Sequence, residues 1–531
     1  MLETLSTRSG HTTVRLGDTL LHSSFNPKRE AERYIDKSLC GKVPSLVLVC
    51  GPGMGYIIKA VKKRYPYIRC IGIWYSEAMA QLAGYAQTPD MWHPGGSDSL
   101  SAFLFQNLSE LEIEGVQIIT WAPTEHAFPK AADRVKKSVR EVFRQINGNI
   151  TTIREFGARW FKNTLYNYQN INFIVQKKNT ELPIVIAASG PSLEKAIPLI
   201  KKYRNSLELW ALSSSVSALM YCNLKPDLIV ATDAGYYASL HMNTGYDISS
   251  IPIAMPLTAK LGKIAEKQPV YLLNSSTYME KELLNSKFSK PIAQNGTVSG
   301  TAIQLALATT SGPVIMAGLD FCYNDIISHV RPHAFDPLIR SHSGRFFPLH
   351  TAVYGRTAGH SEKIPGDSIR VSPALEIYAA WFSRFALREK RAYRLFPSSV
   401  EIPTLTDIGG KGMQKLMQNQ TGSFSAAYVP LSEYPDAKAR KDKTLMLLYN
   451  WNKKLERLES SDPETIIMNL TDMPYVHLLQ VLAIEDVLEV RQKLRLGDKN
   501  AAAAALTRAK DYVNNVLCNA YRRIEEKDGT F

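Results

Sequence analysis

The chain has 531 residues, which at about 150 residues per domain predicts roughly three or four domains. Hydrophobic residues make up 45% and charged residues 21%, a balance that is typical of folded proteins and excludes a wholly disordered chain. The formal net charge of +14 favours an anionic ligand, a nucleic acid or a membrane surface, without choosing among them.

The sequence lacks the signals of export and of membrane insertion. No apolar stretch reaches the roughly 20 residues that a membrane-spanning helix needs. The first residues are rich in Ser and Thr and contain no apolar core of a signal peptide. The six cysteines are scattered, without a CxxC pair. We therefore expect a cytoplasmic protein with buried thiols and without a disulfide framework, a zinc ribbon or stable membrane insertion.

A glycine-rich turn marks the first strongly patterned segment, residues 43–66. An apolar run of strand length leads into CGPGMG (residues 50–55), a helical pattern follows, and a second strand ends near Glu77. This order predicts a βαβ unit. The glycines would let a phosphate approach the helix, and Glu77 could accept a ribose hydroxyl, which resembles the nucleotide-binding half of S-adenosylmethionine-dependent methyltransferases. Glycines also make tight turns for steric reasons, so both interpretations stay open.

A longer series of strands and helices begins at Pro183. Apolar runs of strand length lie at residues 184–189, 207–212, 227–233, 269–274 and 313–320, with helical patterns between them. This alternation predicts an α/β protein with a central doubly wound, Rossmann-like domain whose ligand lies at the carboxyl ends of the strands. We expect a smaller α/β N-terminal domain with a helical linker (1–165), the central domain (166–425) and a helical C-terminal domain (426–531).

Polar turns follow several of these strands. Ser189, Gly190, Pro191, Ser192 and Leu193 lead from the first strand of the central series into a helix. The free N–H groups and partial positive charge at the start of that helix suit a nucleotide phosphate. The other interpretation is a serine that caps an ordinary helix.

Two further motifs lie beside expected strand ends. NGTVSG opens a helix and contains Asn295, Thr297, Ser299 and Gly300 as candidate ligand contacts. Asp320 ends the fifth strand, where active-site residues gather. Each motif also has an ordinary structural explanation, because Thr and Ser cap helices and Asp caps turns.

Residues 323–369 break the rhythm of strands and helices, as a long functional loop would. They contain five of the eleven histidines: His329, His333, His342, His350 and His360. One imidazole could take a proton from a hydroxyl group while a protonated neighbour binds phosphate. The spacing of His329 and His333 would also suit two zinc ligands on a helix. We expect at least two of the five to be solvent-exposed residues without a role.

Several of these motifs together resemble one known family. GPSL after the first strand, the third-strand end at Thr232 and Asp233, NGTVSG, and GLDFCYNDIISH resemble the motility-associated factor glycosyltransferases of bacterial flagella. The opening LHSSFNPKREAERYI is similar to the N-terminal domain of that family. The resemblance covers most of the chain and is strongest over residues 184–333.

The same motifs are similar to those of bacterial sialyltransferases that use CMP-activated sugars. In those enzymes the GPSL turn and an SG-containing helix start hold the nucleotide, which implies nucleotide contacts from Gly190, Pro191, Ser192, Ser299 and Gly300. Ser214 and Asp233 match the polar residues at the ends of the second and third strands, where asparagines are usual.

The resemblance also implies catalytic candidates. His333, in HAF, stands where one of two tyrosines would contact the leaving phosphate, and Tyr323 lies near the position of the other. Arg331 is a further candidate for that phosphate. GHS is similar to the segment with the catalytic histidine, which makes His360 the candidate base, and Asp320 completes the catalytic set.

The function that the resemblance implies is transfer of a nonulosonic acid, a sialic-acid-like nine-carbon sugar, from a CMP-linked donor to Ser or Thr of flagellin, needed for flagellum assembly and motility. The reaction would be a single inverting displacement through an oxocarbenium-like state. Such a displacement does not require a metal or another cofactor. The implied partners are flagellin and the CMP-sugar, and no nucleic acid.

Two alternatives stay open. The central domain also resembles archaeal 6-hydroxymethylpterin pyrophosphokinases, which share the GPSL turn. That reaction needs ATP and Mg²⁺, and carboxylates such as Asp233 and Asp320 would then bind the metal. The other alternative is a non-catalytic flagellar scaffold whose nucleotide folds are vestigial.

Overall fold

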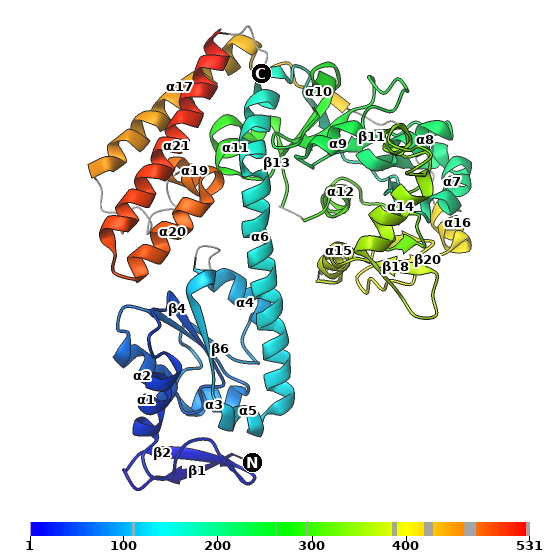
Figure 1. Ribbon diagram of the computed structural model, residues 1–531. Coiled ribbons are helices and arrows are strands. Elements are labelled where there is room, and N and C mark those ends of the chain that lie inside the picture. The colour runs from blue at the N-terminus through cyan, green and yellow to red at the C-terminus, as the bar shows by residue number, and fades with distance from the viewer. Residues whose placement is uncertain are drawn as a thin grey trace. The chain divides into compact units, whose positions relative to one another are not determined.

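The computed structural model of the protein describes residues 2–108, 112–261, 263–293, 296–384, 390–418, 428–460 and 474–526. The chain forms two compact units, which we call the N-terminal unit (Met1–Gly157 with Lys453–Val516) and the central unit (Ala158–Asn452 with Leu517–Phe531). Their borders fall inside three helices, α6 (Pro129–Asn170), α17 (Ala437–Glu456) and α21 (Lys499–Glu526) (Figure 1). The division into three domains stays a prediction, and its border at 425/426 lies outside the described residues.

The N-terminal unit contains two sheets. An antiparallel sheet has the order β1-β2-β3, with β1 (Leu2–Ser6), β2 (Thr12–Leu16) and β3 (Thr19–Leu20). A parallel sheet has the order β6-β5-β4-β7, with β4 (Leu46–Cys50), β5 (Arg69–Ile73), β6 (Met91–Trp92) and β7 (Val116–Thr120). The short helices are α1 (Pro27–Ser38), α2 (Tyr56–Arg64), α3 (Glu77–Leu82), α4 (Leu100–Asn107) and α5 (Ala122–Ala127). The strand β4, the helix α2 and the strand β5 form the predicted βαβ unit.

The central unit is built on one sheet of nine parallel strands in the order β14-β13-β12-β11-β10-β9-β15-β19-β20. The strands are β9 (Ile184–Ala187), β10 (Glu208–Leu212), β11 (Leu228–Val230), β12 (Ile253–Pro256), β13 (Val270–Asn274), β14 (Lys290–Pro291), β15 (Val314–Ala317), β19 (Ala392–Leu395) and β20 (Thr406–Ile408). The helices between them are α7 (Leu193–Lys202), α8 (Val216–Tyr221), α9 (Tyr236–Leu240), α10 (Lys263–Lys267), α11 (Tyr278–Leu283), α12 (Val298–Leu307), α15 (Pro373–Arg384) and α16 (Gly410–Gln418). The predicted doubly wound, Rossmann-like domain is confirmed.

The strand order of this sheet reverses next to β9. The chain runs outward from β9 to β14 on one side and then returns to place β15 on the other side of β9. Every residue of β9 and β15 is buried, as expected for central strands of a sheet that is covered on both faces. The connections leave β9 and β15 in opposite directions, and doubly wound proteins bind their ligands at the carboxyl ends of such a pair of strands.

The segment predicted as a long loop has its own secondary structure. It contains an antiparallel sheet in the order β16-β18-β17, with β16 (Tyr323–Asn324), β17 (Glu362–Lys363) and β18 (Ile369–Val371). It also contains the helices α13 (Asp336–Ser341) and α14 (Leu349–Thr357). The prediction missed them because helices of six and nine residues are too short to establish a clear hydrophobic period. We call residues 323–371 the insertion.

Helices dominate the C-terminal part of the chain (Figure 1). After β21 (Tyr428–Pro430), which pairs with β8 (Val175–Lys177), come α17, α19 (Pro474–Leu482), α20 (Ile484–Arg495) and α21. Among the helices that the structure describes, none combines the length and the apolar character needed to cross a membrane.

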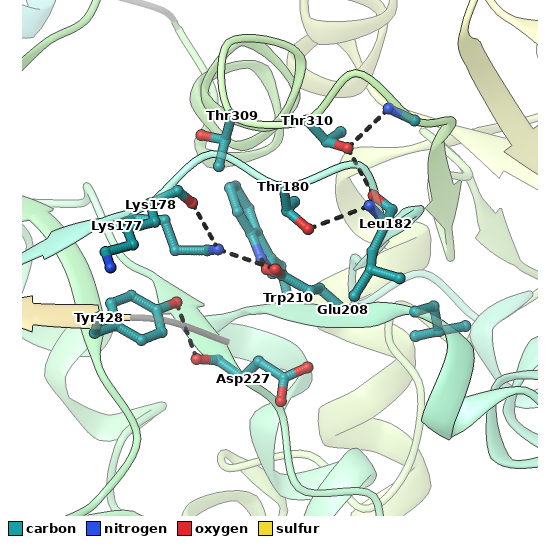
Figure 2. Close-up of polar contacts among 12 residues, drawn as sticks. Lys177, Lys178, Thr180, Leu182, Glu208, Trp210, Asp227, Thr309, Thr310 and Tyr428 are labelled. Atoms are coloured by element: carbon teal, nitrogen blue, oxygen red, sulfur yellow. Dashed lines mark hydrogen bonds and ion pairs between the residues drawn. The ribbon is translucent and has the colours of Figure 1, made fainter. Parts of the chain in front are cut away.

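A buried polar network lies at the amino ends of the central strands, at the edge opposite the predicted site (Figure 2). The ammonium group of Lys177 in β8 donates to Glu208 Oε1 at 2.9 Å, and the two side chains are only 1% and 0% exposed. Trp210 Nε1 donates to the other oxygen of Glu208 at 3.1 Å, and Tyr428 donates to the carbonyl of Asp227 at 3.1 Å. The network therefore attaches the β8–β21 pair to the main sheet.

We predict that Lys177→Met destabilises the central unit by about 3–5 kcal/mol, because it leaves the Glu208 carboxylate buried without its cation. The double variant Lys177→Met/Glu208→Gln should recover most of that loss, since the amide is uncharged and still accepts from Trp210. Urea unfolding followed by circular dichroism measures both. A Lys177→Met protein as stable as the wild type would contradict a buried ion pair at this place.

Candidate functional site

The carboxylate of Asp320 joins the carboxyl ends of β9 and β15. Ser192, just before α7, donates its main-chain N–H to Asp320 Oδ2 at 2.7 Å, and its hydroxyl group also donates to this carboxylate. Asp320 is 5% exposed, and its carbonyl oxygen accepts from the Ser398 hydroxyl at 2.7 Å. An internal anion therefore occupies the start of α7, where the sequence predicts a nucleotide phosphate.

Glycines allow the two turns to approach this closely. The Gly190 N–H donates to the Gly318 carbonyl at 2.8 Å. A β-carbon on Gly190 would lie 2.6 Å from Asp320 Oδ2. One on Gly318, where φ is +72°, would lie 2.7 Å from the carbonyl oxygen of Ala188. The glycine of the GPSL motif thus has a packing role inside the protein.

The remaining residues of the GPSL turn differ in their surroundings. The carbonyl of Ser189 accepts from the Val330 N–H at 2.9 Å, which fixes the histidine-rich segment to the turn. Pro191 is half-buried, whereas Leu193 is fully buried. The Leu193 side chain is therefore a core residue of α7, and a nucleotide contact from the backbone of Leu193 stays a prediction.

The surroundings of Asp320 favour a positioning role. Burial raises the pKa of its carboxyl group, while the hydrogen bonds from Ser192 and the positive charges of Arg394 and Lys195 oppose that rise. Because its two oxygens accept from Ser192, the carboxylate holds the turn in shape.

The predicted contacts at the start of α12 are partly explained by the helix itself. Thr297 Oγ1 accepts from the Gly300 N–H at 2.9 Å and from the Ser299 hydroxyl at 3.2 Å, so Thr297 caps the helix. A β-carbon on Gly300 would lie 2.9 Å from the ring of Trp381 in α15. Gly300 therefore makes room for the side chain of Trp381. Asn295 lies outside the described residues.

Two predicted residues follow β10 and β11 at the same edge. Ser214 is half-buried in the turn after β10. Asp233 is exposed after β11, and its Oδ1 accepts from the Gly235 N–H at 2.8 Å. Burial, together with the charges of Asp233 and Tyr323, raises the pKa of the Tyr378 hydroxyl group. Asp233 and Tyr323 therefore approach the same tyrosine from the third strand and from the insertion.

A cavity of about 230 Å³ lies within the insertion, and residues on both sides of Val330, which contacts the GPSL turn, line it. Its wall brings together the predicted residues Tyr323, Arg331 and His333. It also contains Arg356, which the sequence analysis did not single out. The cavity wall thus combines two guanidinium groups and a phenol with the imidazoles of His329 and His333 and one carboxylate, that of Asp336. The excess of cationic and neutral donors over the single carboxylate suits a ligand with anionic oxygen atoms.

Three histidine rings pack together beside this cavity. His333 lies with its ring centroid 4.3 Å from His329, nearly parallel, and 5.2 Å from His241, edge to face. Phe335 completes the group, 4.9 Å from His333 and 4.6 Å from His241. We call these four residues the histidine cluster.

His241 was missed by sequence reasoning. It follows α9, a helix of only five residues, 92 positions before His333, and no motif surrounds it. The one usable signal was its place shortly after the third strand of the series, since α9 begins at the carboxyl end of β11.

Burial keeps the cluster uncharged at neutral pH. It lowers the pKa of His333 to about 3 and that of His241 to about 4, with a further contribution from the neighbouring imidazoles. It also lowers the pKa of His329, against the nearby charge of Asp336. Burial therefore favours the neutral imidazole at His333, so a phosphate contact from this residue would come from its N–H group and not from a positive charge.

The other histidines of the insertion lie elsewhere. His342, His350 and His360 are exposed, and none of the three lines the cavity, although Arg356 and Thr357, just before His360, do. The segment from His329 to His333 is not helical, so the predicted zinc-ligand geometry is absent there. Over the described part of the chain, no group of three or more His, Cys, Asp or Glu side chains is arranged to hold a metal ion.

The N-terminal glycine turn is filled by side chains of its own unit. His22 Nε2 accepts from the Met54 N–H at 3.1 Å, and a β-carbon on Gly53 would lie 2.4 Å from that nitrogen. The Trp74 indole N–H donates to the Gly53 carbonyl at 2.9 Å. Glu77 is exposed; it accepts from Gln81 Nε2 at 3.1 Å, and a β-carbon on Gly95 would lie 2.3 Å from its carboxylate. The steric interpretation therefore accounts for these glycines.

The comparisons with known proteins agree with this fold. A family model described as "6-hydroxymethylpterin diphosphokinase MptE-like" matches residues 158–325. The solved structure of the MAf glycosyltransferase from Magnetospirillum magneticum AMB-1 matches 99% of this chain and 93% of its own, with a TM-score of 0.64 and 10% sequence identity. The chain therefore has the fold of a motility-associated factor glycosyltransferase, and the resemblance to that family is confirmed for the fold.

Two curated relatives come from Treponema pallidum (strain Nichols). One is an uncharacterized protein, 26% identical over 372 residues, which cover 66% of this chain and 79% of that protein. The other, also uncharacterized, is 25% identical over 117 residues, 22% of this chain and 56% of its own length.

We predict that acid destabilises the wild-type protein more than a His241→Phe variant. The pKa of His241 is about 4 in the folded state and 6.5 ordinarily, so the unfolded state binds more protons between these values. The contribution of this neutral histidine to stability is thus complete above about pH 6.5 and is lost as the pH falls towards 4.

The difference in unfolding free energy between wild type and His241→Phe should therefore change by up to about 1.4 kcal/mol per pH unit in that window. Urea unfolding at several pH values from 7.5 to 4.5 measures it. If the free energies of unfolding of the two proteins change equally with pH, the pKa of His241 is not lowered in the folded state.

Proposed function

We propose that this protein is an inverting glycosyltransferase that moves a nonulosonic acid from a CMP-linked donor to a serine or threonine of flagellin in the cytoplasm. The observation that carries the proposal is a likeness of fold over 99% of the chain, combined with polar turns that gather at one edge of the central sheet. The name of the solved neighbour supplies the reaction class, and the sequence motifs supply the donor and the acceptor.

The nucleotide is assigned to the carboxyl edge of the central sheet. Ser214 after β10, Asp233 after β11 and the hydroxyl groups of Thr297 and Ser299 at α12 offer polar atoms there. Ser192 already donates to Asp320. In this proposal the GPSL turn therefore acts through its shape, which Asp320 maintains, and the nucleotide takes its hydrogen bonds mainly from the neighbouring turns.

The leaving phosphate is assigned to the cavity of the insertion. Tyr323 and Arg331 line it together with His333. As the bond between the anomeric carbon and the phosphate oxygen breaks, negative charge grows on that oxygen. Donors that are already in place stabilise such charge without reorganisation. A cationic arginine and the O–H and N–H of neutral side chains are suited to this task.

The acceptor hydroxyl needs a base, and His360 is the proposed one. The imidazole takes the hydroxyl proton while the acceptor oxygen forms a bond to the anomeric carbon from the face opposite the leaving group. The donor bond breaks in the same step and CMP leaves with its electron pair, so the anomeric configuration inverts. His360 is exposed, and the helix before it ends with Arg356 and Thr357 on the cavity wall. A protein acceptor can therefore reach it from solvent.

A diphosphokinase is the second candidate, because a family of that description matches residues 158–325. It would need carboxylates for Mg²⁺, and Asp320 and Asp233 are the available ones at this edge. Both already accept hydrogen bonds, Asp320 from Ser192 and Asp233 from Gly235. The matched region also ends before most of the insertion, which the glycosyltransferase proposal uses.

We predict that the purified protein transfers nonulosonic acid from its CMP-linked form to flagellin, detected as a mass increase on serine or threonine peptides. His360→Ala should lower turnover by about 10²–10⁴-fold, because a general base contributes that much, while the affinity for CMP stays within about twofold. His342→Ala is the matched control, since His342 is also exposed in the insertion but follows α13, outside the GHS segment that contains His360.

Three outcomes would contradict the proposal. His360→Ala with full turnover would remove the proposed base. Loss of turnover in His342→Ala but not in His360→Ala would mean that His360 is not the base. Transfer of diphosphate from ATP to a hydroxymethylpterin, abolished by EDTA and without sugar transfer, would favour the diphosphokinase.

A further inference from the structure

His241 joins the histidine cluster from outside the insertion. It follows α9, at the carboxyl edge of the main sheet, whereas its three neighbours lie in the insertion. Within the described part of the chain its buried Nδ1 has no hydrogen-bond partner. The ring therefore contributes to the cluster through packing against His333 and Phe335.

The hydrogen bonds of His333 define its protonation pattern. The main-chain N–H of Phe335 donates to His333 Nδ1 at 3.4 Å, so Nδ1 is an acceptor and carries no proton. In the neutral ring the proton is then on Nε2. That nitrogen is buried and, over the described residues, has no acceptor. His333 is 6% exposed and is one of the residues that line the cavity, so a residue of the cavity wall carries an unmatched N–H group.

We propose that His241 is a positioning residue that, together with Phe335, holds the His333 ring in the orientation and tautomer that offer Nε2–H to an oxygen atom of a ligand in the cavity. The identity of that ligand as the phosphate of a CMP-sugar rests on the proposed function. The arrangement of the rings does not depend on it.

The electrostatic surroundings agree with a neutral donor. Besides the cluster's own His329, the charged and titratable groups around it are Asp233 after β11, Tyr323 in β16, Arg331 before α13, Asp336 in α13 and Arg356 in α14. Burial and the neighbouring imidazoles together disfavour an imidazolium at His333. A buried N–H without a partner is costly in a folded protein, and a ligand oxygen would satisfy it.

The test is nuclear magnetic resonance of the full-length protein with ¹⁵N-labelled histidine, in which the His333 signals are assigned by their absence in His333→Gln. In the wild type, His333 should show the Nε2–H tautomer and should not titrate between pH 8 and 5.5. In His241→Ala, where water reaches the ring, its pKa should move to about 6–7. In His241→Phe, which keeps an aromatic ring against Phe335, it should stay untitrated.

Addition of CMP, the probe for the proposed ligand, should shift the Nε2–H signal of the wild type. A wild-type His333 with its proton on Nδ1, or one that titrates above pH 5.5, would overturn the proposal. So would a His241→Ala protein in which His333 behaves as in the wild type. The expected tautomer and variant pattern without any response to CMP would support the positioning role and contradict the assignment of the nucleotide phosphate to this cavity.

Discussion

The pair of hydrogen bonds from Ser192 to the buried carboxylate of Asp320 is the contact on which the candidate site depends. It joins the two strands at which the order of the central sheet reverses, because Ser192 follows β9 and Asp320 follows β15. The same turn holds the insertion through the Ser189 carbonyl and Val330. Val330 lies between His329 and His333, which belong both to the cavity wall and to the histidine cluster. Loss of the Asp320 carboxylate would therefore disturb the turn and the insertion together.

Two glycine-rich turns of similar sequence pattern have different environments in this protein. Both follow a buried strand and precede a helix, so both looked suited to a phosphate. At Gly53 the space is taken by His22, and at Gly190 it is taken by Asp320. The two turns differ in their neighbours. The turn at Gly190 lies beside polar turns from neighbouring strands and contacts the segment that lines the cavity, whereas the described residues around Gly53 form no such set. A glycine-rich turn alone therefore indicates close packing. Whether such a turn binds a ligand depends on the residues around it.

The sequence predicted the parts of the fold that rest on local pattern. The buried runs of β9, β10 and β15 and the polar residues after them were found because strand length and turn chemistry are local properties. The strand β12 was missed because Pro256, at its end, and the preceding proline resemble a turn. Gly300 was interpreted as a ligand contact, yet it makes room for Trp381. His241 could not be found, since only the folded sheet brings it to His333.

The most direct test of the central claim, that the carboxyl edge of the central sheet binds the nucleotide, is amide hydrogen exchange with and without saturating CMP. The account predicts slower exchange in residues 189–193, 296–301 and 329–336 when CMP is bound, and no change in residues 50–56. Protection of the N-terminal turn at residues 50–56, or exchange that CMP leaves unchanged throughout the central unit, would contradict it.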